Sequence, residues 1–182
     1  RLVKQYNCQG CHLVENRGGQ LVEHIGLPEY GPPNLNSEGR KANPDGLLSF
    51  FNNPSIIRPN LQVKMPSFHQ ISDEDWDAII AYFQHIDSEN INYRGIHEFD
   101  ANSQEFAAGA KLHEIGQCNS CHFYGEEFPT GDAPTWAPNL ALTKERLNAG
   151  WVTEWLRNPG AIMPGTKMPA PYVPDNEILS LD

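Results

Sequence analysis

Long apolar runs and basic side chains are both scarce in this sequence of 182 residues. It contains no stretch of about 18 consecutive apolar residues, so it predicts no transmembrane helix within these residues. The 13 basic residues stand against 23 acidic ones, a formal net charge of −10. This balance argues against nucleic acid and anionic membrane surfaces as partners, and it favours a protein partner with a basic docking surface.

Apolar material is also limited, since hydrophobic residues make up 39% of the chain and Gly and Pro contribute 15 residues each. The length allows one domain or two small ones, and units of about 90 residues bury only a modest core by themselves. The Gly and Pro content favours loops over long helices, although it lies below the level typical of disordered chains.

There are only four cysteines, and all of them fall in two copies of a C-x-x-C-H motif, Cys8-Gln9-Gly10-Cys11-His12 and Cys118-Asn119-Ser120-Cys121-His122. This motif is typical of covalent c-type haem attachment, in which two thiols add across two vinyl groups and the adjacent His lies under the iron. A thioredoxin-like dithiol would need a βαβ setting that the sequence lacks, and one zinc site would leave both histidines unexplained. A pair of disulfides is a further alternative.

The two motifs are followed by blocks that recur in the same order, which predicts duplication of a unit of about 100 residues. Pro33-Asn34-Leu35 returns as Pro138-Asn139-Leu140, 105 residues later. The segment 50–54 returns at the same offset as 155–159, and Lys64-Met65-Pro66 returns as Lys167-Met168-Pro169.

This order of C-x-x-C-H, P-N-L and K-M-P resembles class I cytochrome c, and residues 164–168 closely match the methionine-ligand loop of that family. The resemblance covers essentially the whole chain, in a plan similar to dihaem cytochromes of the cytochrome c4 type. It implies an all-α fold of two tandem domains, each with a few helices and long loops wrapped around one covalently attached haem c, with His below the iron and Met above.

On this resemblance, the expected iron ligands are His12 with Met65 and His122 with Met168, and the expected thioether cysteines are Cys8, Cys11, Cys118 and Cys121. A thioether favours ferrous iron and raises the reduction potential relative to a second His. Met163 is an alternative to Met168, but it lacks the Lys and Pro neighbours that Met65 and Met168 share. His69, four residues after Met65, is the alternative ligand in the first half.

Other residues receive supporting roles. The resemblance implies that the backbone carbonyls of Pro33 and Pro138 accept the second ring N–H of the two histidines. Trp151 and Trp155 are expected to line the pocket of the second haem, where an indole N–H could donate to a propionate. His113 is expected to be a packed or half-exposed residue.

Local signals predict two helices and no strand. Ser103 is the expected N-cap of a helix over 104–117, in which Gly109 permits close approach of another helix. Ser72 is the expected N-cap of a second helix, with acidic residues in its first turn and an apolar face formed by Trp76, Ile79, Ile80 and Phe83. The predicted organisation is domain 1 at 1–90, a linker at 91–102 and domain 2 at 103–182.

The two halves differ at their ends. Comparison with the second half places Arg1 inside a helix, and the closing helix that follows Ser72 has no complete counterpart after Leu179. We therefore expect the chain to be a segment of a longer polypeptide, with membrane anchors or further domains outside this window.

The expected function is electron transfer by two low-spin haem c groups, with no catalysis because both axial positions are filled. The carrier is either a free periplasmic protein or the dihaem cytochrome c subunit of a membrane respiratory complex. The alternative is an oxidoreductase of the dihaem peroxidase type, which needs one displaceable axial ligand. Thioether attachment of haem implies the periplasm or the outer face of a bacterial membrane.

Overall fold

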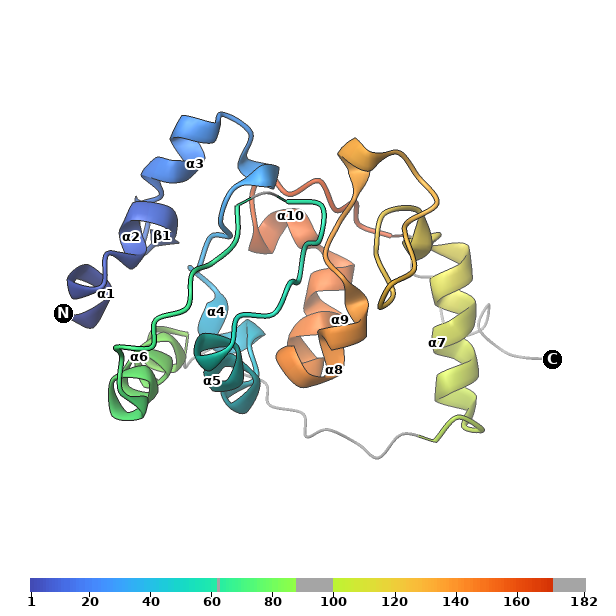
Figure 1. The fold of residues 1–182 in the computed structure, drawn as a ribbon. Helices are drawn as coiled ribbons and strands as arrows, with labels where there is room; N and C mark the ends of the chain where they lie inside the picture. The colour runs from blue at the N-terminus through green and yellow to red at the C-terminus, as the bar shows by residue number, and fades with distance from the viewer. Residues whose placement is uncertain (62, 88–99, 172–182) are drawn as a thin grey trace.

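A computed structural model describes residues 1–61, 63–87 and 100–171, which form short helices joined by long loops (Figure 1). We call residues 1–87 the N-terminal half and residues 100–171 the C-terminal half. The described elements of the N-terminal half are α1 (Leu2–Gln5), α2 (Cys8–Cys11), β1 (Leu13–Val14), β2 (Arg17–Gly18), α3 (Gln20–Ile25), η1 (Pro28–Tyr30), α4 (Glu38–Lys41), α5 (Pro44–Asn52) and α6 (Asp73–Ile86). Those of the C-terminal half are α7 (Gln104–Ile115), η3 (Cys118–Ser120), η4 (Ala133–Thr135), η5 (Leu140–Leu142), α8 (Thr143–Arg146), α9 (Ala149–Arg157) and α10 (Pro159–Ile162).

A small antiparallel hairpin corrects the expectation of no strand. Strands β1 and β2 pair Leu13 with Gly18 and Val14 with Arg17. The two residues between them, Glu15 and Asn16, both have positive φ, as tight two-residue hairpin turns require. Each strand has only two residues, too few for an alternating pattern to be recognised in the sequence.

Helix α6 carries the predicted apolar face, and the main hydrophobic core forms around it. The Ser72 hydroxyl accepts a hydrogen bond from the Asp75 N–H, which confirms the predicted N-cap. The rings of Phe51 and Trp76 stack with centroids 4.0 Å apart. The buried cluster consists of Val14, Phe51, Ile71, Trp76, Ile79, Ile80 and Phe83, so it lies entirely in the N-terminal half.

Helix α7 begins where the sequence predicts, with the Ser103 hydroxyl accepting from the Phe106 N–H. It ends at Ile115, two residues earlier than expected, because Gln117 turns into the left-handed region at φ 48°. The expected close approach at Gly109 is not seen, since a Cβ placed there meets no described atom within 4 Å.

The sequence repeat reappears as a structural repeat in the middle of each half. Helices α4 and α5 correspond to α8 and α9 at the same 105-residue offset, with identical lengths of 4 and 9 residues. The N-caps Asn43 and Asn148 also correspond, and each side chain accepts from the N–H two residues further on.

The two halves meet at these equivalent segments, where α4 and α5 lie beside α8 and α9 (Figure 1). Ala42 forms an antiparallel bridge with its counterpart Leu147. On either side of this bridge the Asn43 N–H donates to the Arg146 carbonyl, and the Asn148 N–H donates to the Lys41 carbonyl, both at 2.8 Å. Each segment therefore gives and receives the same hydrogen bond, as at a two-fold symmetric contact.

Among the described residues, no helix combines the length and apolar character needed to cross a membrane. Most of the predicted linker at 91–102 and the region of the predicted incomplete closing helix lie outside the described residues.

Candidate functional site

The first C-x-x-C-H motif occupies a single helical turn. Helix α2 spans Cys8–Cys11 and begins after Asn7, whose φ of 53° reverses the chain direction at the end of α1. His12 follows the turn in an extended conformation, so the helical backbone ends before it. Both thiols are partly exposed and free, and partial burial raises the pKa of Cys8 above its usual value.

The second motif repeats this arrangement with a shorter turn. The 3-10 helix η3 spans Cys118–Ser120 and begins after Gln117, which has positive φ as Asn7 does. Cys118 and Cys121 are again free and partly exposed. No disulfide joins these cysteines, and no group of three or more His, Cys, Asp or Glu side chains gathers into a metal site in the described part of the chain.

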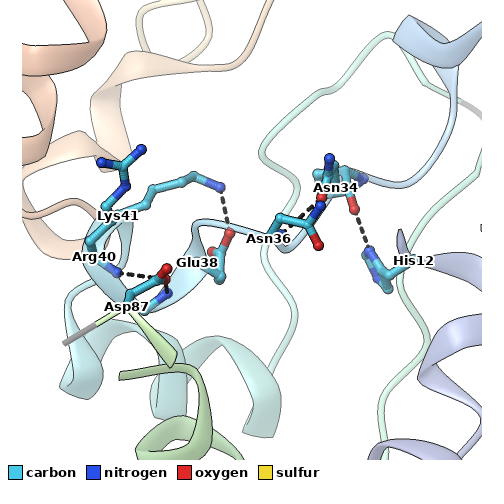
Figure 2. A network of polar contacts seen from close by, with 9 residues as sticks. His12, Asn34, Asn36, Glu38, Arg40, Lys41 and Asp87 are labelled. Atoms are coloured by element: carbon cyan, nitrogen blue, oxygen red, sulfur yellow. Dashed lines mark hydrogen bonds and ion pairs between the residues drawn. The ribbon is translucent and has the colours of Figure 1, made fainter. Parts of the chain in front are cut away.

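Both motif histidines are oriented by a proline carbonyl, the contact expected from the resemblance. The Nδ1 atom of His12, the residue labelled in Figure 2, lies 2.7 Å from the Pro33 carbonyl oxygen. The Nδ1 atom of His122 lies 2.7 Å from the Pro138 oxygen. Because a carbonyl only accepts, each Nδ1 carries the proton, and each Nε2 keeps a lone pair for a metal.

Burial also favours the neutral form of both imidazoles. It lowers the pKa of His12 and of His122 below the usual value for histidine, and it outweighs the opposing effect of each carbonyl contact. Neutral imidazole is the form that ligates metals. In both halves, therefore, the tautomer and the charge of the histidine are the ones that a metal ligand needs.

The segments that present the two carbonyls are held by equivalent backbone hydrogen bonds. The Leu35 N–H donates to the carbonyl of Leu13, the residue after His12, and the Leu140 N–H donates to the carbonyl of Phe123, the residue after His122. Both bonds measure 2.9 Å. Each P-N-L segment is therefore tied to the chain beside the histidine that it orients.

Asparagine side chains complete these segments, a role that sequence reasoning did not assign although the repeated P-N-L pattern was its signal. Asn34 Oδ1 accepts from the Asn36 N–H, in the network shown in Figure 2. Asn139 is buried, and its amide both accepts from the N–H groups of Gly125 and Ala141 and donates to the Gly125 carbonyl.

The candidate methionines lie in different surroundings. Met65 is partly buried against the main core, whereas the sulfur of Met168 lies 2.9 Å from Nε1 of Trp155. Met163 follows the last residue of α10, where its N–H donates to the Pro159 carbonyl. The roles of Met65 and Met168 as iron ligands remain predictions, as do those of His12 and His122.

The other singled-out residues divide into exposed and packed ones. His69 is exposed. His113 is half-buried and hydrogen bonds to the hydroxyl of Tyr124, as expected for a packed residue. Trp151 is buried, and its indole N–H has no hydrogen-bond partner among the described residues, so an acceptor such as a propionate could pair with it.

One family model matches the first part of the chain. Residues 1–83 match the family model described as "Cytochrome C oxidase, cbb3-type, subunit III". This part of the chain is therefore similar to a cytochrome c-type domain. The match includes the first C-x-x-C-H motif and the first P-N-L and K-M-P segments.

A curated relative points in the same direction. "Cytochrome c oxidase subunit 2" of Bacillus subtilis (strain 168) is 34% identical over 98 residues, which cover 50% of this chain and 26% of that protein. The chain therefore spans about a quarter of the length of this relative. No solved structure matches.

Proposed function

We propose that the chain transfers electrons through two low-spin c-type haems, one in each half, as a subunit of a membrane respiratory complex. The observation that carries the proposal is the repeated pairing of a motif histidine with a proline carbonyl at 2.7 Å. Haem c supplies one-electron chemistry when bound, by cycling between ferrous and ferric iron.

The residues of each half fit such a group. Cys8 and Cys11, or Cys118 and Cys121, would form its thioethers, while His12 or His122 would offer a neutral Nε2 to the iron. The Pro33 and Pro138 carbonyls hold the proton at Nδ1, which keeps each ring in the ligating tautomer. Met65 and Met168 would each offer a thioether sulfur as a second protein ligand.

The subunit role is favoured over a free periplasmic carrier by the comparisons, since both matching descriptions name cytochrome c oxidase subunits. The charge of the chain suits docking of a basic redox partner, because the formal net charge is −10 before any propionate is added. Outside the cytoplasm, such a subunit accepts electrons on one side and passes them to the rest of its complex.

The ligand assignment is tested by redox titration of Met65→His and Met168→His variants produced with haem attachment. Each variant is expected to lower one reduction potential and leave the other in place, because imidazole favours ferric iron more than a thioether does. Met163→His is the matched control, and it is expected to change neither potential.

The number and type of haems are tested on the unmodified protein. Intact mass is expected to show two attached haems, and absorption spectra are expected to show low-spin bands and the weak Met-to-ferric-iron transition from both. A single attached haem would contradict the dihaem proposal. A high-spin haem that binds cyanide readily or turns over peroxide would instead favour the dihaem peroxidase alternative.

A further inference from the structure

Helix α9 carries two indole rings that support one another. Trp151 and Trp155 lie four residues apart on this helix, and their rings stack with centroids 5.1 Å apart and planes at 16°. Trp151 is 6% exposed, so the buried ring fixes the plane in which the partly exposed Trp155 ring lies. Stacking of this kind restricts the rotamers that Trp155 can adopt.

The edge of the Trp155 ring is directed at the sulfur of Met168, from Nε1 at 2.9 Å. The Met168 backbone is also held, because its N–H donates to the Thr166 hydroxyl at 3.3 Å. A thioether is a weak acceptor that has two lone pairs. When one lone pair accepts the indole N–H, the other remains for a metal, and its direction is set by the ring.

Within the described residues of the N-terminal half, no indole N–H is seen donating to Met65. Trp155 corresponds to Phe50 at the 105-residue offset, and Met168 corresponds to Met65 in the other K-M-P block. A phenyl ring has no N–H, so Phe50 cannot make this bond with Met65. The two otherwise similar methionine sites therefore differ by a hydrogen bond to sulfur.

We propose that Trp155 is a positioning residue that orients the Met168 thioether and raises the reduction potential of the second haem, an inference that rests on the proposed His/Met ligation. A hydrogen bond draws electron density away from the sulfur and makes it a poorer donor. Ferric iron needs that donation more than ferrous iron does, so the bond favours the ferrous state.

Trp155→Phe tests this proposal, because it removes the indole N–H but keeps an aromatic ring that can stack on Trp151. It also reproduces Phe50, the residue at the equivalent position of the first half. Loss of one such bond is expected to shift the ferrous-to-ferric equilibrium constant of the second haem by about threefold to tenfold towards ferric. The Met-to-ferric-iron band of that haem is expected to shift as well, while the first haem stays unchanged.

Trp136→Phe is the matched control, since its Nε1 donates to the Gly131 carbonyl at 2.9 Å and not to a methionine. It is expected to leave both equilibrium constants unchanged. A second substitution, β-(3-benzothienyl)alanine at position 155, replaces only the N–H by sulfur and keeps the size of the ring. It is expected to reproduce the effect of Trp155→Phe.

The role of Trp155 would be overturned if Trp155→Phe left the equilibrium constant and the Met-to-ferric-iron band of the second haem unchanged. An equal shift in Trp136→Phe would also overturn it. So would a benzothienyl variant that behaves like the unmodified protein. These results are distinct from failure of the proposed function. That failure would appear in the unmodified protein, as the lack of a Met-to-ferric-iron band or as a Met168→His variant with unaltered potentials.

Discussion

Asn139 joins the orienting carbonyl of Pro138 to the rest of the C-terminal half. Its side chain is 8% exposed and makes hydrogen bonds of 2.7, 3.0 and 3.1 Å with the backbone groups of Gly125 and Ala141. Its own N–H donates to the Ile57 carbonyl in the N-terminal half. The side-chain amide therefore fixes the loop before it and the turn after it, while the backbone N–H makes a contact between the halves.

We expect Asn139→Ala to lower the free energy of unfolding by about 2–3 kcal/mol, because it leaves buried backbone groups without partners. Chemical denaturation of the purified protein with attached haem would measure this loss. Asn36→Ala is the control, since that side chain bonds only to exposed groups of Asn16, and it is expected to cost less than about 1 kcal/mol. Equal losses in both variants would contradict the role of Asn139.

At the scale of elements, α4 and α6 pack unusually closely through a glycine. A Cβ placed at Gly39 would lie 2.0 Å from the Phe83 carbonyl oxygen. The Gly39 and Arg40 N–H groups also donate to the Asp87 carboxylate just beyond the end of α6, a contact shown in Figure 2. Because Gly39 has no side chain, α4 and α6 can approach closely, and the Asp87 carboxylate can accept from the N–H groups at the start of α4.

Gly39→Ala is expected to destabilise the protein by about 3 kcal/mol, because the clashing atom belongs to the backbone and cannot rotate away. Thermal unfolding followed by circular dichroism is a suitable measurement. Gly109→Ala in the exposed part of α7 meets no described atom within 4 Å and is expected to leave stability unchanged or to raise it by up to about 1 kcal/mol. A Gly39→Ala variant as stable as the Gly109→Ala variant would refute this account.

At the scale of the whole molecule, the symmetric contact sets the relation between the two halves. It contains the Ala42–Leu147 bridge, and two ion pairs also join the halves, one between Arg40 and Glu154 and one between Lys167 and Glu29. One partner in each ion pair, Glu154 and Lys167, is substantially exposed, so the backbone contact rather than the ion pairs is expected to provide most of the stabilisation.

Gly46 lies in this contact, where a Cβ would be 2.1 Å from the Glu145 carbonyl oxygen. Gly46→Ala is therefore expected to loosen the halves and to speed hydrogen exchange at the Asn43 and Asn148 amides by about tenfold or more. Exchange monitored by NMR or mass spectrometry would detect this. Gly160→Ala, whose Cβ meets no described atom within 4 Å, is the control, and acceleration in that variant as well would count against a local effect.

Local signals in the sequence predicted much of this architecture. The Ser72 and Ser103 caps, the buried face of α6 and the repeated blocks all depend on residues close together in the chain, and the structure confirms the caps and the buried face. The β1–β2 hairpin was missed because it depends on positive φ at Glu15 and Asn16, residues that are not a standard turn pair.

The sequence by itself determined the candidate residues of the site, because C-x-x-C-H, P-N-L and K-M-P are short motifs that recur in the same order in both halves. Only the tertiary structure decided which groups meet across longer distances. The Trp155 indole donates to Met168, and Asn43 pairs with Arg146 as Asn148 does with Lys41. Hydrogen-bond geometry of this kind depends on how helices pack, and packing is not encoded in any single local pattern.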